Sequence, residues 1–186
     1  MKIAVTGKMC SGKTTLCNYL CELEPRFQIF SFGKKVKDVA SDLFNMDPQI
    51  KDRTLLTIIG QKMREINKDV WVNYVVQQCK DVEYCLVDDL RYQNEYEALV
   101  KNGFKIIQLN ISDELQEYRI RNIYPLNYLD HLLARTHPSE NNTFQWLKNT
   151  IDGSHPHLSI DSSEDREDIK NLVRGFINLF KKKYII

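Results

Sequence analysis

A glycine-containing loop near the start of the chain restricts the possible folds more than any other feature. The apolar run Lys2–Thr6 is followed by Gly7-Lys-Met-Cys-Ser-Gly-Lys-Thr14 and then by a helical pattern to about Leu23. Gly7 can leave the strand in a conformation that is costly for other residues, and Gly12 lets backbone N–H groups close around phosphate oxygens. The helix that follows points its positive end at the same anion. The pattern therefore predicts a nucleotide-binding phosphate loop between a buried strand and a helix.

Three side chains of this loop carry separate predictions. Lys13 is expected to bridge the β- and γ-phosphates of the nucleotide, and the hydroxyl of Thr14 is expected to ligate Mg²⁺. Two interpretations stay open for Cys10. It is either a loop position without a chemical role, or a reactive thiol made acidic by the helix N-terminus and by Lys8.

The rest of the chain alternates short apolar strands with helical segments, which is typical of a parallel α/β sheet. Further strands are expected at 27–32, 84–88, 104–111 and 157–160, and helices at 36–44, 52–80, 93–101, 112–123 and 169–180. The helical segment 52–80 is predicted to break near 67–69. Residues 124–149 have weak periodicity and are predicted to form a flap. The expected fold is a single three-layer P-loop NTPase domain over 1–186, with a central, mostly parallel five-stranded sheet, flanking helices and a lid at about 119–149.

Composition excludes several classes of protein. The 26 basic and 25 acidic residues give a net charge of +1, so no general attraction to a nucleic-acid backbone is expected. No apolar run approaches the roughly 20 residues needed to cross a bilayer, so no membrane partner is expected. The five cysteines have no metal-type spacing and are predicted to be reduced thiols, which indicates a cytoplasmic protein.

Carboxylates and an arginine follow the predicted strand 84–88. Asp88 and Asp89 are candidates for the acidic partner of a Mg²⁺ shell, and Asp89 is the predicted ligand together with Thr14. The glycine and the guanine-reading motif of signalling GTPases are missing. Arg91 can bind a second phosphate with two parallel hydrogen bonds, which is needed when the acceptor is itself a phosphate ester.

Four segments resemble the deoxynucleoside monophosphate kinases of phages and large DNA viruses, which belong to the adenylate-kinase-like P-loop kinases. They are Ser31-Phe-Gly-Lys-Lys-Val-Lys37, Gly60-Gln-Lys-Met-Arg64 with Asp69-Val-Trp71-Val, Asp89-Leu-Arg91-Tyr-Gln-Asn94-Glu95, and His137-Pro-Ser-Glu140. The four occur in the family's order and span nearly the whole chain. The resemblance implies ATP and Mg²⁺ as reactants and a (deoxy)nucleoside monophosphate as acceptor, bound by a monomer or a homodimer.

The resemblance also implies roles for matched residues. ATP would be bound by Gly7, Lys8, Cys10, Ser11, Gly12, Lys13, Thr14 and Thr15. The acceptor would be bound by Lys37, Arg64, Asp69, Trp71, Asp89, Arg91 and Glu95, within an acceptor-binding helical region at 33–80. Lys13, Arg91 and Arg135 are the predicted catalytic residues, and Arg135 would be the lid arginine.

Structural alternatives stand beside several of these roles. Trp71 is either a contact for the base or part of the core, Asp69 is either a substrate ligand or a helix cap, and Arg64 is either a phosphate ligand or part of a surface ion pair. Arg119 and Arg121 are either lid arginines or surface residues, and Glu117 stands four residues before Arg121. His137 and Glu140 are expected to be structural.

The predicted reaction is ATP-dependent transfer of a phosphoryl group to a (deoxy)nucleoside 5′-monophosphate, which yields the diphosphate. Two alternatives remain open at this point. The first is a P-loop kinase of another small phosphate ester, such as a phosphomevalonate-like compound. The second is an ATP-binding module without catalytic activity.

Overall fold

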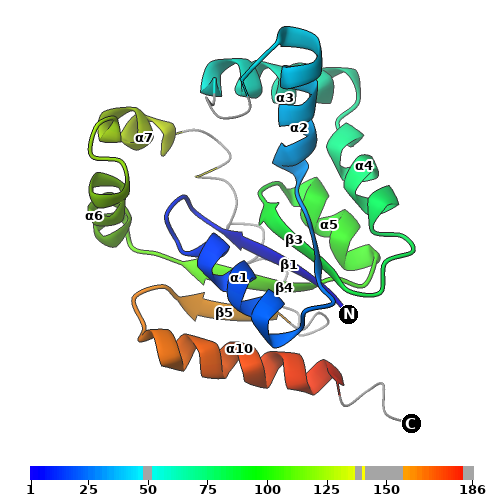
Figure 1. The fold of residues 1–186 in the computed structure, drawn as a ribbon, viewed down its shortest axis with the longest axis vertical. Helices are drawn as coiled ribbons and strands as arrows, with labels where there is room; N and C mark the ends of the chain where they lie inside the picture. The colour runs from blue at the N-terminus through cyan, green and yellow to red at the C-terminus, as the bar shows by residue number, and fades with distance from the viewer. Residues whose placement is uncertain (48–51, 137–139, 141–156, 182–186) are drawn as a thin grey trace.

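Five parallel strands form the central sheet (Figure 1). The protein is described by a computed structural model over residues 1–47, 52–136, 140 and 157–181. The strands lie in the order β2-β3-β1-β4-β5, and every pairing is parallel. Their bounds are Lys2–Gly7 (β1), Gln28–Phe30 (β2), Cys85–Leu90 (β3), Lys105–Asn110 (β4) and His157–Asp161 (β5). The predicted five-stranded parallel sheet is therefore confirmed.

Helices cover both faces of this sheet because its strands alternate their apolar side chains. Ile3 and Val5 of β1 pack on one face with α1 and α10, whereas Ala4 packs on the opposite face with α4 and α5. The helices are α1 (Lys13–Leu23), α2 (Phe32–Phe44), α3 (Arg53–Ile66), α4 (Val70–Gln78), α5 (Gln93–Lys101), α6 (Asp113–Ile123), α7 (Tyr128–Ala134) and α10 (Arg166–Lys181). Two apolar clusters result, one on each face, and the three-layer prediction is confirmed.

Polar side chains fix the starts of three helices. The hydroxyl of Ser31 accepts the N–H of Lys34 at the start of α2, and Asp52 accepts the N–H of Leu55 at the start of α3. The hydroxyl of Ser112 accepts the N–H of Leu115 at the start of α6, which agrees with the predicted helix at 112–123. The predicted break between α3 and α4 is also present, since α3 ends at Ile66 and α4 begins at Val70.

The α6–α7 pair stands apart from the sheet, beside the loop that follows β1 (Figure 1). Helix α7, Tyr128–Ala134, falls in the segment that the sequence predicts as a flap and for which it indicates no particular helix. The helix buries His131, which stacks on Tyr124 at 3.7 Å, but leaves Leu129 and Leu133 exposed. Its apolar residues therefore give no core-facing pattern in the sequence. The predicted lid residues 137–139 and 141–149 lie outside the described residues.

The connections after β1 and β3 diverge at the carboxyl edge of the sheet. Helix α1 follows β1 and covers one face, whereas α5 follows β3 and covers the other. Because β1 and β3 are neighbours, this divergence opens a crevice between them, the usual ligand position in open α/β sheets. The loop Gly7–Thr14 and Arg91 meet at this edge. No helix within the described ranges has the length and apolar character to cross a bilayer.

Candidate functional site

The loop after β1 has the geometry that its glycines predict. A Cβ atom on Gly7 would lie 2.5 Å from the Ser11 hydroxyl and 2.9 Å from the carbonyl oxygen of Leu109, so a larger residue does not fit without a shift. Gly12 has a φ of +95° and begins α1 in the left-handed region, which L side chains rarely adopt. The loop therefore turns tightly and presents the start of α1 to the crevice.

Lys13 folds back over this loop. Its Nζ atom donates hydrogen bonds to the carbonyl oxygens of Gly7 (2.6 Å) and Lys8 (2.7 Å). Burial, and after it the nearby guanidinium of Arg91, lower the pKa of Lys13 to about 8, while Glu140 opposes this shift. A positive group that is buried beside another one is stabilised when an anion binds between them. This environment suits a phosphate ligand.

The reactive-thiol interpretation of Cys10 is not supported. Burial raises the pKa of the Cys10 thiol, with a lowering contribution from Lys13. Lys8 does not act as the activating cation, because its Nζ atom forms an ion pair with Asp113 of α6 at 2.8 Å. Cys10 has a φ of +60°, so its backbone is in the left-handed region that the turn of the loop requires. The interpretation of Cys10 as a loop position without a chemical role agrees with this structure.

A large cleft of about 970 Å³, here called the loop cleft, opens beside the phosphate loop. Six of the eight predicted ATP-binding residues line it, from Cys10 to Thr15, whereas Gly7 and Lys8 do not. Sequence reasoning missed the other side of the cleft, which includes Asn18, Tyr19, Tyr124, Ser162, Glu164 and Arg166. These residues come from three distant parts of the chain and match no local motif. Only the fold brings them together.

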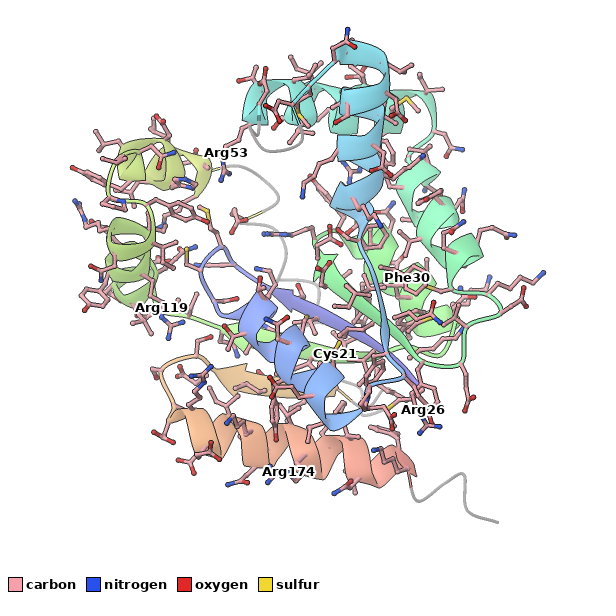
Figure 2. The ribbon with its side chains drawn as sticks, viewed as in Figure 1. Cys21, Arg26, Phe30, Arg53, Arg119 and Arg174 are labelled. Carbon is pink, nitrogen blue, oxygen red and sulfur yellow. The ribbon has the colours of Figure 1, made fainter. Side chains whose placement is uncertain are left out.

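Arg119 of α6, labelled in Figure 2, also lines the loop cleft. Its guanidinium donates to the carbonyl oxygen of Cys10 (3.2 Å) and to that of Ser162 (2.7 Å). The Ser162 hydroxyl in turn donates to the carbonyl oxygen of Ser11 at 2.8 Å. Arg119 thus connects α6, the phosphate loop and the residues after β5. Arg121 instead forms an exposed pair with Glu117, so the surface alternative holds for it.

Arg135, the predicted catalytic lid arginine, does not lie at the phosphate loop in this structure. Its guanidinium pairs with Asp113 at 3.1 Å and with Glu117 at 3.6 Å, both on α6. It lines neither the loop cleft nor the second cleft described below. Both carboxylates belong to α6 and attract its guanidinium. The catalytic role of Arg135 stays a prediction.

Asp88 and Asp89 have different environments near the end of β3, where the strand has one residue more than β1. Ala4 pairs with Val87 and Thr6 pairs with Leu90, so β3 has one residue more than β1 over this stretch. Asp89 turns toward α2 and accepts three hydrogen bonds, from the Ser31 hydroxyl and from the N–H groups of residues 32 and 33, at 2.7–2.9 Å. These bonds fix the start of α2. Asp89, the predicted metal ligand, is thus fully engaged in this structure.

Asp88, unlike Asp89, has a carboxylate oxygen that is not engaged. Its Oδ1 atom is buried and has no hydrogen-bond partner among the described residues. Burial raises the pKa of Asp88 to about 6, and the adjacent Asp89 carboxylate adds to this effect. A buried carboxylate oxygen without a donor fits a cation or a cation-bound water better than an engaged one does. Among the residues that could hold Mg²⁺, Asp88 therefore fits better than Asp89, and Thr14 stands exposed at the start of α1.

A smaller cleft of about 230 Å³, here called the helix cleft, lies between α2, α3 and the residues after β3. Five of the predicted acceptor-binding residues line it: Lys37, Arg64, Asp89, Arg91 and Glu95. Three of the five are cationic, and the two carboxylates among them are largely engaged by other groups. The helix cleft therefore offers an anion-binding surface next to the phosphate loop.

Glu95 orients the arginines of the helix cleft. Its Oε2 atom accepts the N–H groups of Arg91 (2.8 Å) and Tyr92 (3.0 Å), and its Oε1 atom pairs with Arg64 at 3.2 Å. The side chain is almost completely buried, and burial raises the pKa of Glu95 to about 7. Arg64 also donates to the carbonyl oxygen of Gly60 and stacks over the ring of Tyr92 at 4.4 Å. Arg64 is thus a positioned, half-buried cation, and its ion pair belongs to the site.

Trp71 and Asp69 do not line the helix cleft, so the structure does not bring them together with the other five predicted acceptor-binding residues. Trp71 is 3% exposed, packs within the core cluster and donates its indole N–H to the carbonyl oxygen of Gly60 at 3.1 Å. Asp69 precedes α4 and accepts a hydrogen bond from the amide of Asn94 at 2.8 Å. Both residues support the helices that carry the cleft. The apolar environment and the hydrogen bond of Trp71 explain why the core alternative prevails.

Glu140 connects the phosphate loop with Arg91 of the helix cleft, a contact that the sequence did not reveal. Its carboxylate forms an ion pair with Arg91 and accepts the N–H of Met9 in the phosphate loop at 2.6 Å. The sequence placed Glu140 in a motif expected to be structural, and no local spacing links it to Met9, 131 positions away. His137 of the same motif lies outside the described residues.

Comparisons with known proteins agree with this architecture. A model of the AAA domain family matches residues 3–122. The structure of an unliganded sugar kinase from Janibacter sp. HTCC2649 matches with a TM-score of 0.57 and 12% identity, over 95% of this chain and 94% of that chain. Deoxyadenosine kinase from M. mycoides matches with dATP bound (TM-score 0.55, 16% identity, 96% and 100% coverage) and with the products dCMP and dCDP bound (0.56, 17%, 96% and 99%).

The two kinds of comparison support different statements. The curated proteins give no match. At 12–17% identity, the solved structures establish the fold, which is the P-loop NTPase fold of kinases. The family model covers more than half of the 186 residues and includes the phosphate loop, Asp88, Asp89 and Arg91. The chain therefore belongs to the AAA domain family of P-loop proteins.

Proposed function

We propose that this protein transfers the γ-phosphoryl group of ATP to a (deoxy)nucleoside 5′-monophosphate and releases ADP and the nucleoside diphosphate. The observation that carries the proposal is the cationic helix cleft beside the phosphate loop. Lys37, Arg64 and Arg91 line one side of the crevice, and Lys13 lies on the other. A kinase needs two anion sites next to each other only when its acceptor carries a phosphate.

Positioning and charge neutralisation would supply the catalysis. The phosphate loop and Lys13 would hold the β- and γ-phosphates of ATP, and Arg64 and Arg91 would hold the acceptor phosphate in line. The acceptor oxygen is already anionic at neutral pH, so no general base is required. Lys13 and Arg91 would stabilise the charge that develops on the transferred group. Mg²⁺, held through Thr14 and by way of water through Asp88, would neutralise the phosphate oxygens when bound.

A second candidate function is phosphorylation of an unphosphorylated nucleoside. A hydroxyl acceptor needs a general base, and Asp88, with its pKa raised to about 6 by burial, is a buried carboxylate at the carboxyl end of β3. The solved structures of similar fold include a deoxyadenosine kinase. Against this candidate stands the composition of the helix cleft, because Lys37, Arg64 and Arg91 line it and favour an anionic acceptor over an uncharged one.

A panel of acceptors tests the proposal. ADP release would be measured with ATP and Mg²⁺ against deoxynucleoside and ribonucleoside monophosphates, the matching nucleosides and a phosphomevalonate-type ester. We expect ADP release with nucleoside monophosphates and formation of the diphosphate. Release with nucleosides alone would establish the second candidate. ATP binding without turnover on any member of the panel would contradict catalytic function.

The two aspartates of β3 are expected to respond differently to the same substitution. Asp88→Asn should raise the Mg²⁺ concentration needed for half-maximal activity by roughly 10- to 100-fold, the usual effect of losing an outer-shell ligand. Asp89→Asn should instead lower the free energy of unfolding by about 1–3 kcal/mol, because a carboxylate that accepts three hydrogen bonds at the start of α2 is lost. Mg²⁺ titration of activity and urea unfolding of both variants would check this. If Asp89→Asn changed the Mg²⁺ dependence and Asp88→Asn changed the stability, Asp89 would be the better candidate for the metal ligand.

The raised pKa of Glu95 predicts a pH dependence of acceptor use. Only the ionised carboxylate pairs fully with Arg64, so kcat/KM for the acceptor should rise as the pH passes through about 7. Stability should change in the opposite sense. The folded state holds the Glu95 proton more tightly than the unfolded state does. The free energy of unfolding should therefore fall as the pH rises from the usual carboxyl pKa, near 4.5, to about 7.

Glu95→Gln serves as the control for this prediction. The variant keeps the shape of the side chain but does not titrate. The change near pH 7 should therefore vanish from the pH dependence of kcat/KM for the acceptor and from that of the free energy of unfolding. The acceptor phosphate itself titrates near pH 6, and that step should remain in the variant. If Glu95→Gln keeps the wild-type step near pH 7, another group is responsible for it.

A further inference from the structure

The carboxylate of Glu140 lies where a backbone N–H of the phosphate loop and two cationic side chains, Arg91 and Lys13, come together. Glu140 is 8% exposed, its Oε2 atom accepts the N–H of Met9 at 2.6 Å, and its Oε1 atom pairs with Arg91. Lys13 lies close enough for Glu140 to raise its pKa against the effect of burial. One carboxylate is thus bound by a backbone N–H of the phosphate loop and by a guanidinium, beside a buried ammonium group.

This set of donors is the one that a phosphate requires. Backbone N–H groups of such loops bind phosphate oxygens, and a guanidinium binds carboxylates and phosphates through the same planar geometry. Arg91 lines the helix cleft, whereas Met9 belongs to the loop on the other side of the crevice. The carboxylate oxygens of Glu140 therefore stand between the donor and acceptor sides, where a transferred phosphoryl group has to pass.

Glu140 is not needed to hold the loop in shape. The carbonyl oxygen of Met9 accepts a hydrogen bond from the side-chain amide of Gln116 at 2.9 Å, and Gln116 is almost completely buried on α6. Arg91 is oriented from its own backbone, because its N–H donates to Glu95 at 2.8 Å. Both partners of Glu140 are therefore anchored by other residues. A purely structural ion pair would explain the contact of Glu140 with Arg91. It would not explain why Glu140 also accepts a hydrogen bond from the N–H of Met9 in the phosphate loop.

We propose that Glu140 is an internal competitor for the phosphate site: in the ligand-free protein its carboxylate occupies a phosphate-oxygen position, and a bound phosphate displaces it from Met9 and Arg91. This inference rests on the proposed function, because it assumes that the loop binds phosphates. Arg91 then exchanges one anion for another and is never left as an unpaired half-buried cation. An acceptor without a phosphate cannot make this exchange, so Glu140 favours phosphorylated acceptors.

Binding of tripolyphosphate tests the proposal without relying on turnover. Calorimetric titration would compare the full-length wild type with Glu140→Gln, which keeps the shape of the side chain and removes the charge. We expect the Kd of tripolyphosphate to fall about 10-fold in the variant, since binding no longer has to displace a charge-assisted pair. Glu97→Gln is the matched control, because it removes the same charge from an exposed position on α5, and its Kd should stay within about 2-fold of wild type. An unchanged or higher Kd for Glu140→Gln would overturn the proposal.

Glu140→Asp provides an independent variant if the glutamine variant does not fold. Aspartate keeps the charge but is shorter by one methylene group, so it cannot reach both donors, and the Kd should fall below that of wild type by a smaller factor. A Kd equal to or above wild type would again overturn the proposal. Failure of the wild type itself to bind tripolyphosphate would contradict the phosphate-loop assignment. Wild-type binding with no tightening in either variant would contradict only the role of Glu140.

Discussion

Replacement of Lys13 by alanine is expected to reduce kcat by roughly 100- to 1,000-fold, the effect of removing one preorganised donor at a transferring group. The ammonium group sits over the loop and interacts with the carbonyl oxygens of Gly7 and Lys8, so it is already in place when a phosphate enters. The fold should stay intact. Burial lowers the pKa of Lys13 to about 8, which means that the folded protein disfavours its charge, so removal of the charge should not cost stability on that account.

Coupled measurement of ADP release and thermal unfolding of the same preparation would check this result. Lys62→Ala is a suitable control, because Lys62 is exposed on α3 and pairs only with Glu65 among the described residues. It should keep wild-type kcat. If Lys13→Ala kept more than about a tenth of the wild-type rate while folded, the assignment of the phosphate loop would be wrong.

Arg91→Lys and Arg64→Lys are each expected to lower kcat/KM for the acceptor by at least about 10-fold, while the KM for ATP changes little. Lysine keeps the charge but cannot donate two parallel hydrogen bonds to a phosphate, nor can it hold the stacked position of Arg64 over Tyr92. Loss of one charge-assisted hydrogen bond is worth about 1.5–3 kcal/mol, which corresponds to this factor or more. The phosphate loop would hold the phosphates of ATP, so the KM for ATP should change little.

Arg121→Lys is the matched control for the two arginine variants, because Arg121 forms an exposed pair with Glu117 on α6. Its kinetic constants should equal those of the wild type. Steady-state kinetics with each substrate varied in turn would separate the two effects. If ATP binding fell and acceptor use were spared, Arg64 and Arg91 would belong to the donor side, and the helix cleft would not be the acceptor site.

The sequence predicted best what depends on local pattern. The alternation of strands and helices, the cap at Ser112 and the phosphate loop follow from the chemistry of neighbouring residues, and the structure contains all three. Helix α7 was missed because its exposed leucines do not form a face toward the core. Local pattern is enough where the residues that interact are close in the chain.

The candidate site was harder to predict because its contacts join distant residues. Arg135 was expected at the phosphates, but the carboxylates of α6 compete for it. Asp88 and Asp89 are adjacent, and only the pairing of β3 with β1 shows which carboxylate supports a helix and which has a buried oxygen without a partner. Glu140 belongs to a segment that the sequence singles out, but its contact with Met9 could not be predicted, because the two residues are 131 positions apart.

The extra residue in β3 has a consequence for how this protein can vary. In a regular strand, Asp88 and Asp89 would alternate strictly between the two faces, and moving one would move the other. The irregular pairing adds one residue to this stretch of β3, so that Leu90 packs in the same core cluster as Val87. Deletion of one residue here would turn Leu90 away from that cluster, whereas substitution of either aspartate would leave Leu90 in place. One irregular step in a strand thus lets β3 carry two polar residues near its end without removing an apolar side chain from the core.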